Sequence, residues 1–142
     1  MTTTQKVPQR HEIPIEYTWD LGLMYASDAA WEQAVVQLEE RIPEIVAFQN
    51  KIGESAQSLL QVLQLRDELS LHLYQIYRYA SHRQDSDSTD TAAQMLAERA
   101  GSLVAKVSAA TAFIEPEILA IPTETINQWI AEEPGLKVYD YA

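Results

Sequence analysis

The chain has 142 residues, of which 46% are hydrophobic and 22% charged, a composition typical of a single folded domain and not of a disordered segment. Asp and Glu total 21 against 10 Lys and Arg, and the resulting formal charge of −11 opposes binding to nucleic acids and anionic membrane surfaces. The absence of cysteine excludes disulfides and thiolate metal ligands. No stretch approaches about 18 consecutive apolar residues or forms a signal peptide, so we expect a cytoplasmic protein without a membrane span.

The first 26 residues show no sustained helical period and contain Pro8 and Pro14. We therefore predict two parts, an extended N-terminal arm (1–26) and a helical domain (27–142). The side chains expected to dock the arm are those of Trp19, Leu21, Leu23 and Tyr25.

The first predicted helix starts at a Ser27 or Asp28 cap, runs to about Lys51, and is ended by Gly53. Pro43 removes a backbone donor inside this run, which predicts a bend near residues 39–41. Its apolar stripe consists of Trp31, Val35, Leu38, Ile42, Ile45 and Ile52.

The second helix is predicted from about Ser55 to His82, with Leu59 and Leu60 in a short preceding turn. Its common face carries Val62, Leu65, Leu69, His72, Leu73, Ile76 and Ala80. The polar segment QDSDSTDT (84–91) is typical of a loop that reverses the chain and caps the next helix.

The third helix, from about Thr89 to Ile114, has a strict seven-residue apolar pattern. The pattern comprises Ala93, Leu96, Ala100, Leu103, Val107, Ala110 and Ile114. The small residues in it favour close helix packing, and the short connections favour antiparallel neighbours. A shorter helix from Thr123, its cap, to Glu132 precedes a tail (136–142). The predicted fold is all-α: an antiparallel bundle of three long helices plus a short C-terminal helix, with an extended arm.

The chain has three histidines, and their spacing does not predict a metal site. An HExxH zinc site needs two histidines one helical turn apart, whereas Ile15 replaces the second one after His11, and Pro14 interrupts the required helix. His72 lies on an apolar stripe and is expected to be a core or subdomain-interface residue, and His82 lies on a different face. We assign no catalytic, cofactor or metal residue to this chain.

The acidic groups have structural explanations. Asp85, Asp87 and Asp90 lack the glycine and glutamate spacing of a calcium loop, so helix capping is preferred. The pairs at 115–117 and 132–133 lie at predicted helix boundaries and are interpreted as solvated acids and not as paired catalytic carboxylates.

The densest aromatic and basic cluster contains Tyr74, Tyr77, Arg78, Tyr79 and Arg83. Such a cluster can stack on a ligand, or it can pack one helix against another, and both alternatives remain open. The candidate contact residues for a peptide or a neighbouring domain are His72, Tyr77, Arg78 and Tyr79.

An ordered series of segments covers nearly the whole chain: RHEIPIEYTWDLGLMY, SDAAWEQAV, LSLHLYQIYRYASHRQDSD, VSAATAFIEPEIL and EEPGLKVY. The series resembles the N-terminal helical region of the oligoendopeptidase F family. Particular landmarks are the arm from Arg10 to Leu21, the helix start with Asp28 and Trp31, the Tyr79-Ala80 pair, and FIEPEIL at 113–119. All of them are packing motifs and none is catalytic.

The resemblance implies a cytosolic zinc peptidase of the thimet-oligopeptidase clan that cuts short peptides inside a cleft. Its zinc ligands and catalytic glutamate would lie downstream, in a catalytic domain that this chain is expected to lack. The implied role is therefore a structural and substrate-gating subdomain, inactive by itself, whose partners are that domain and oligopeptides. A self-standing helical interaction module is the alternative, and an independent enzyme is disfavoured because no base, nucleophile and stabiliser can be assembled. We also expect the isolated chain to form homo-oligomers through exposed apolar surface.

Overall fold

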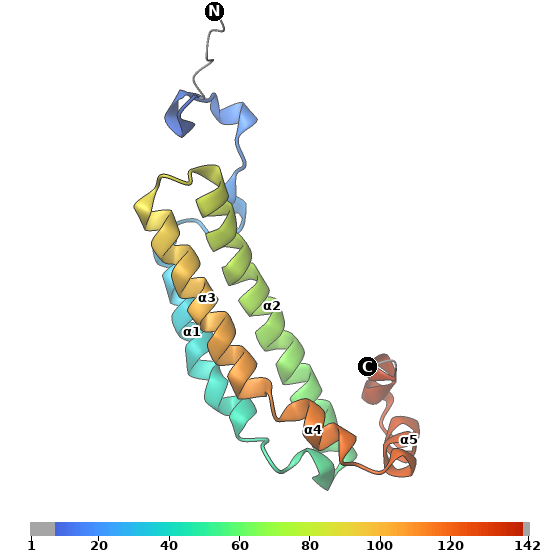
Figure 1. Ribbon diagram of the computed structural model, residues 1–142. Helices are drawn as coiled ribbons and strands as arrows, with labels where there is room; N and C mark the ends of the chain where they lie inside the picture. The colour runs from blue at the N-terminus through green and yellow to red at the C-terminus, as the bar shows by residue number, and fades with distance from the viewer. Residues whose placement is uncertain (1–7, 141–142) are drawn as a thin grey trace, which may run out of the picture.

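The computed structural model describes residues 8–140, which are helical with irregular connections and contain no β-strand. Five α-helices follow one another: α1 (Asp28–Val46), α2 (Ala56–Ser86), α3 (Thr91–Thr111), α4 (Ile114–Leu119) and α5 (Thr123–Glu132). The predicted all-α class is confirmed. The three long helices lie side by side, and the chain reverses direction from α1 to α2 and again from α2 to α3 (Figure 1).

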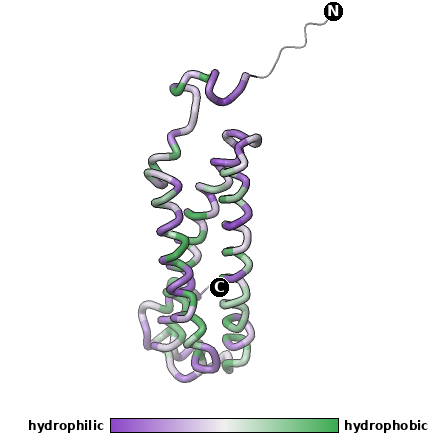
Figure 2. Tube along the Cα trace, turned by 90° about the vertical axis from the view of Figure 1, so that its left-hand side faces the viewer, coloured by the Kyte–Doolittle hydropathy of each residue, from purple (hydrophilic) through white to green (hydrophobic). Residues whose placement is uncertain are grey.

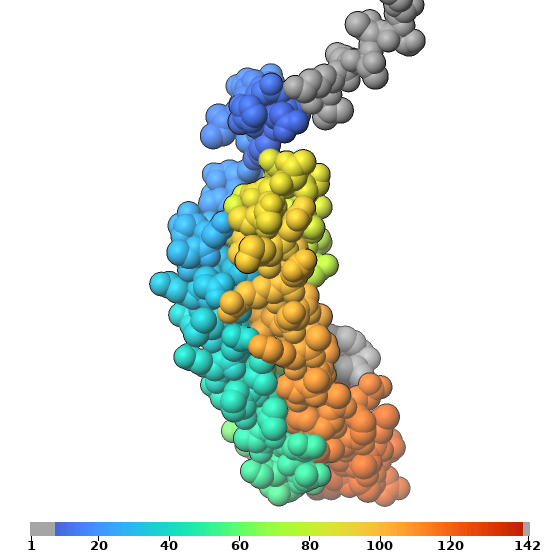
Figure 3. Space-filling model, turned by 60° about the vertical axis from the view of Figure 1, so that its left-hand side comes forward, coloured from blue at the N-terminus to red at the C-terminus, as the bar shows by residue number. Residues whose placement is uncertain are grey.

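The described part of the N-terminal arm contains three single turns of 3₁₀-helix, at Arg10–Glu12, Ile15–Tyr17 and Leu21–Leu23. It projects beyond the end of the long helices (Figures 1 and 3). Leu21 packs against the core, as does Tyr25, whereas Leu23 is 86% exposed and does not dock the arm as we predicted. The part of the predicted arm before Pro8 lies outside the described residues.

Helix α1 begins as the sequence predicts and ends earlier. The Ser27 hydroxyl accepts a hydrogen bond from the backbone N–H of Ala30 (3.1 Å), which satisfies one free donor of the first turn. The predicted end near Lys51 is wrong, because the chain leaves the helix after Val46 and Asn50 adopts a left-handed conformation (φ 65°). Ile52 is still fully buried, but in a separate 3₁₀ turn, Ile52–Glu54.

Helix α2 is longer than predicted at its C-terminal end. Ser55 caps it, and it continues through Ser86, so the first three residues of the segment predicted as a loop (84–91) are helical. Leu59 and Leu60 are buried inside the helix, so the preceding turn predicted for them is wrong. The remaining turn is short, and Asp90 caps α3 by accepting from the N–H of Ala92 (2.9 Å), which confirms capping by this acidic segment.

The third predicted helix is divided into two. The heptad residues of α3 are buried or half-buried as predicted, but α3 stops at Thr111, and the turn at 112–113 redirects the chain into α4. Thr111 donates its hydroxyl to the carbonyl of Val107 (2.9 Å), a local side-chain bond that competes with regular helix. Ile114 is therefore buried at the start of α4 and not at the end of α3.

The C-terminal segment packs against α2. The predicted bounds of α5 are confirmed, although Pro122, without a side-chain bond, occupies the cap position predicted for Thr123. The following 3₁₀ turn, Pro134–Tyr139, places Leu136 in the core, where it is 1% exposed, and the Tyr139 hydroxyl donates to Asp67 Oδ2 (2.9 Å). Residues 134–139 are thus ordered structure, and residues 141–142 of the predicted tail lie outside the described part.

The core runs along the inner faces of the long helices and continues under α4 and α5. Its largest fully buried side chain is Trp31, whose indole Nε1 donates to the backbone carbonyl of Ile76 (2.8 Å) and ties α1 to α2. Hydrophobic residues recur along each long helix, interleaved with hydrophilic ones (Figure 2), and no buried side chain is charged or polar within 8–140. Burial of apolar surface is therefore the main stabilising contribution.

Candidate functional site

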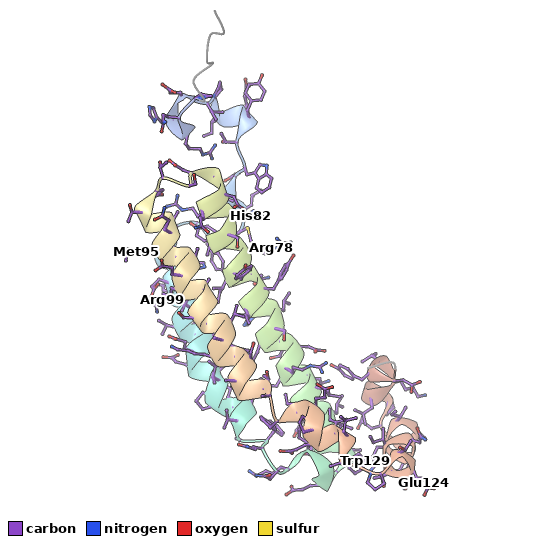
Figure 4. All side chains as sticks on the ribbon, in the orientation of Figure 1. Arg78, His82, Met95, Arg99, Glu124 and Trp129 are labelled. Carbon is purple, nitrogen blue, oxygen red and sulfur yellow. The ribbon has the colours of Figure 1, made fainter. Side chains whose placement is uncertain are left out.

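The four predicted contact residues all lie on α2, but on different faces of it. His72 faces the gap between α1 and α2, and Tyr77 faces α3. Tyr79 is 4% exposed and belongs to the core. Arg78 extends from α2 into solvent. Met95 and Arg99 extend from α3 on the opposite side of this pair of helices (Figure 4). The structure therefore does not bring the four side chains together into one site.

His72 is solvent-exposed, so a position in the core is wrong for this residue. The buried arc of α2 is centred on Leu69, Ile76 and Ala80, and His72 lies at its edge. The groove around it carries charged side chains, among them Arg41, which forms ion pairs with Glu44 (3.3 Å) and with Glu68 (2.8 Å) outside the lining. The subdomain-interface alternative for His72 stays a prediction.

Tyr79 joins a polar network at the arm end of the three long helices. Its hydroxyl donates to Asp28 Oδ1 (2.7 Å), and Arg83 forms ion pairs with Asp28 (2.9 Å) and Asp90 (3.3 Å). Tyr25 packs edge-on against the Tyr79 ring, with 5.3 Å between centroids. The network links the first turn of α1, the end of α2 and the cap of α3, which favours the packing alternative for Tyr79 and Arg83.

The charges in this network perturb one another. The hydrogen bond from Arg83 lowers the pKa of Asp28, with a further contribution from the Tyr79 hydroxyl. Burial, followed by the hydrogen bond to Asp28, raises the pKa of Tyr79 to about 12. The ionised carboxylate and the neutral phenol are therefore the favoured states near neutral pH.

Tyr74 and Arg78 form an exposed pair one turn apart on α2. Arg78 Nε donates to the Tyr74 hydroxyl (2.9 Å), and the guanidinium carbon lies 5.1 Å from the centroid of the Tyr74 ring. This hydrogen bond raises the pKa of Arg78 above its ordinary value. The structure shows no ion pair between Arg78 and any carboxylate of residues 8–140. The pair thus presents an oriented cation on an aromatic support.

A shallow groove runs between α2 and α3 next to this pair, and we call it the α2–α3 trough. Its lining consists of Ser70, Leu73, Tyr74 and Tyr77 from α2 with Gly101 and Val104 from α3. Tyr74 is 55% exposed and Tyr77 44%, although both rings are largely apolar. Tyr77 and Arg78 stand out in the sequence as part of an aromatic and basic cluster, but Gly101 does not, because the heptad pattern describes only the buried face of α3.

The arm meets α2 at His82, where Trp19 docks as predicted, although His82 was not expected as its partner. The Trp19 ring lies edge-on to the His82 ring, with 4.7 Å between centroids, while Trp19 itself is 67% exposed. His82 Nδ1 is buried without a hydrogen-bond partner in the described part of the chain. The YTWDL arm segment thus touches the end of α2 through its tryptophan.

No group of three or more His, Asp or Glu side chains within residues 8–140 is arranged to hold a metal ion. These residues therefore do not fit the zinc that the resemblance implies for longer members of the family. Glu117 accepts from the N–H of Asn50 (2.7 Å) and Glu133 from that of Gly135 (3.1 Å), so both act at chain turns. None of the helices in the described region has the length and apolarity needed to cross a bilayer.

Known peptidases match almost the whole chain. It is 34% identical over 137 residues to oligopeptidase PepF of Bacillus subtilis, covering 96% of this chain and 20% of that protein. It is 35% identical to group B oligopeptidase PepB of Streptococcus agalactiae, covering 93% of this chain and 22% of that protein. The crystal structure of oligoendopeptidase-F from Enterococcus faecium superposes with a TM-score of 0.73 at 32% identity, covering 80% of this chain and 22% of that one. No family model matches the sequence.

The chain is homologous to the N-terminal region of oligoendopeptidase F. The resemblance drawn from the sequence segments is thereby confirmed. The chain spans about one fifth of the length of these oligoendopeptidase F relatives. The landmarks of the family have structural roles here: Trp31 fills the centre of the core, and Asp28 belongs to the Tyr79–Arg83 network.

Proposed function

We propose that this chain is the structural and substrate-gating subdomain of a zinc metalloendopeptidase that hydrolyses short oligopeptides in the cytoplasm, and that it is not catalytic alone. The match to named oligopeptidases over 96% of the chain, but only 20% of the relative, carries the proposal. In this division residues 1–26 form the arm and residues 27–142 the helical subdomain. The remaining polypeptide of the peptidase supplies the zinc ligands and the catalytic glutamate.

The chemistry of the described residues supports an inactive role. Tyr79 and Arg83 are engaged with Asp28 inside the helix network, and His72 stands apart from both. A hydrolytic site needs a nucleophile or activated water, a base and a stabilising group within a few ångströms of one another. We find no such set on residues 8–140, and the proposal assigns to this chain a role through its shape and contact surface.

A gating role fits the side-by-side packing of the long helices. The antiparallel helices α1, α2 and α3 pack side by side and present a continuous helical face, which the proposal places at the entrance of the peptidase cleft. In the proposed assembly this face stands over the peptidase cleft, and folded proteins are too wide to pass beneath it. The partners of the chain are then the catalytic domain and the oligopeptide substrates.

The test is hydrolysis of a quenched fluorescent peptide of about eight residues by the purified chain, with added zinc and with chelator. We expect no cleavage by the chain alone. We expect activity when the remaining four-fifths of the B. subtilis PepF polypeptide is supplied. Chelator-sensitive cleavage by the chain alone, or stable zinc at one ion per chain, would contradict the proposal.

A self-associating helical module is the second candidate, supported by the exposed arm. Ile15 is 89% exposed, Tyr17 76% and Leu23 86%. Several large apolar side chains exposed on one short segment are typical of an interaction surface. A defined oligomer at micromolar concentration by light scattering, together with no effect of the chain on the PepF polypeptide, would favour this candidate over the subdomain.

A further inference from the structure

The α2–α3 trough has small residues at its base and large apolar side chains along its sides. Ser70 and Gly101, the two smallest lining residues, come from opposite helices. The walls carry Tyr74, Tyr77 and Val104, and both tyrosine rings are about half exposed. Apolar side chains held at a helix surface next to small residues form the kind of groove into which another helix packs.

Gly101 has no structural requirement inside the chain. It lies at the centre of α3, and a Cβ added to it would meet no heavy atom within 4 Å apart from the adjoining part of its own helix. Glycine in a helix interior is less stable than alanine, and its φ here is not positive, so neither local conformation nor crowding explains it. What glycine provides at this position is space above the α3 backbone, which lets the backbone of a partner approach closely.

Arg78 supplies the polar complement beside this groove. In the described part of a chain with net charge −11, Arg41, Arg66, Arg83 and Arg99 all pair with carboxylates. Arg78 is instead held by Tyr74, and its side chain is exposed. A guanidinium oriented in this way matches a carboxylate on a docking partner.

The backbone of α2 and α3 offers no free hydrogen-bonding groups in the trough, and this favours a helical partner over an extended one. The N–H and C=O groups of α2 and α3 are used within their own helices. An extended peptide lying there would find no backbone partners for its own polar groups, whereas a helix satisfies these groups internally. Each copy of the chain carries a charge of −11, which disfavours a second copy as the occupant of this trough; the self-association considered above uses the exposed arm instead.

We infer that the α2–α3 trough is the docking site for an amphipathic α-helix of the remaining peptidase polypeptide, with small apolar side chains over Gly101 and a carboxylate on Arg78. The inference rests on the proposed function and adds to it the place and chemistry of the contact. The docked helix packs as a further bundle member against the outer surfaces of α2 and α3.

The experiment measures the affinity of the full chain for the B. subtilis PepF polypeptide lacking its matched N-terminal fifth, by isothermal titration calorimetry. Gly101→Leu fills the floor of the trough and is expected to weaken binding at least tenfold. Arg78→Gln removes the charge, and a loss of about fivefold is expected. Ala109→Leu makes a comparable addition at an exposed position of α3 outside the trough lining, so its affinity should stay within twofold of that of the wild type.

Each outcome decides something different. Normal binding by both trough variants would overturn the docking site and leave the proposed function standing, whereas no binding by the wild type would count against both. If an excess of an eight-residue peptide competed with binding, the occupant of the trough would be an extended ligand and not a helix. If the wild type formed a dimer and Gly101→Leu did not, the occupant would be a second copy of the chain. Either result would overturn the proposed helix.

A second measurement covers the case in which the shortened PepF polypeptide does not fold alone. The chain is joined to that polypeptide in place of the matched fifth, and its thermal unfolding is followed by circular dichroism. The docking site predicts that Gly101→Leu lowers the unfolding temperature of the joined protein but not that of the isolated chain. An equal change in both proteins would overturn it.

Discussion

Trp31 is the side chain whose loss should most clearly weaken the packing of α1 on α2. It is 0% exposed, and its indole N–H donates to the Ile76 carbonyl at 2.8 Å. Trp31→Phe keeps an aromatic ring but removes the donor and leaves a void. Because Ile76 lies inside a continuous helix, its carbonyl keeps an intrahelical partner and is not orphaned.

The expected cost has two parts. Loss of a buried hydrogen bond costs about 1 kcal/mol. The void, on the order of 40 Å³, costs about 1 kcal/mol more at roughly 24 cal/mol per Å³ of cavity. The free energy of unfolding should therefore fall by about 2 kcal/mol, which lowers the unfolding temperature of a domain of this size by roughly 8 °C.

The assay is thermal and urea unfolding followed by circular dichroism at 222 nm. Trp19→Phe is the matched control, since the same change at a 67% exposed side chain should cost less than about 0.5 kcal/mol. Equal stability of Trp31→Phe and wild type would refute the placement of Trp31 at the centre of the core.

Three further changes follow from single contacts. Gly101→Ala should stabilise the isolated chain by about 0.5–1 kcal/mol in thermal unfolding, since the added Cβ meets open space; a loss of stability would show hidden crowding. Leu136→Ala should cost about 2–5 kcal/mol because Leu136 is 1% exposed, and an unchanged urea midpoint would mean that the C-terminal turn does not pack on α2. The pKa of Asp28 is lowered in the folded state, so its ionised carboxylate adds to the free energy of unfolding at pH values above about 4, the pKa in the unfolded chain. This stabilisation is lost as the pH falls through the lower pKa of the folded state. Because its side chain is 42% exposed, this contribution is only about 0.5–1 kcal/mol, and Asp28→Asn should flatten the acid limb of a stability–pH curve; an unaltered limb would contradict the assignment.

The buried faces of the helices follow from residue spacing. The buried positions of α3 were predictable, because a helix face packed on two neighbours needs an apolar residue at every turn; these positions are Ala93, Ala100, Leu103 and Val107. The bounds of α5 were predictable as well. The family likewise followed from ordered sequence segments.

Helix ends depend on contacts that periodicity does not contain. Ile52 continues the register of α1 and is buried, yet a turn with Asn50 in the left-handed region precedes it. Asn50 is the available signal, since asparagine tolerates that conformation. Its N–H bond to Glu117 of α4, 67 residues away, helps hold the turn and cannot be read from local sequence.

The candidate contact surface was predictable only in part. Tyr77 and Arg78 stand out in the sequence as an aromatic and basic cluster. Tyr79 can be assigned to the interior only once it is known which face of α2 is turned toward α1. Gly101 becomes informative only when α2 and α3 are placed side by side and the space above it is seen to be open. His72 shows the opposite error, since it shares a stripe with buried residues but lies at its edge.

The most direct test of the central claim compares length selectivity in two proteins. One is the B. subtilis PepF polypeptide without its matched N-terminal fifth, and the other carries this chain in that place. The account predicts that the joined protein cleaves a peptide of about eight residues and leaves a folded protein intact, and that the shortened polypeptide is less active or loses this discrimination. Equal rates and equal selectivity in the two proteins would contradict a gating role for this chain.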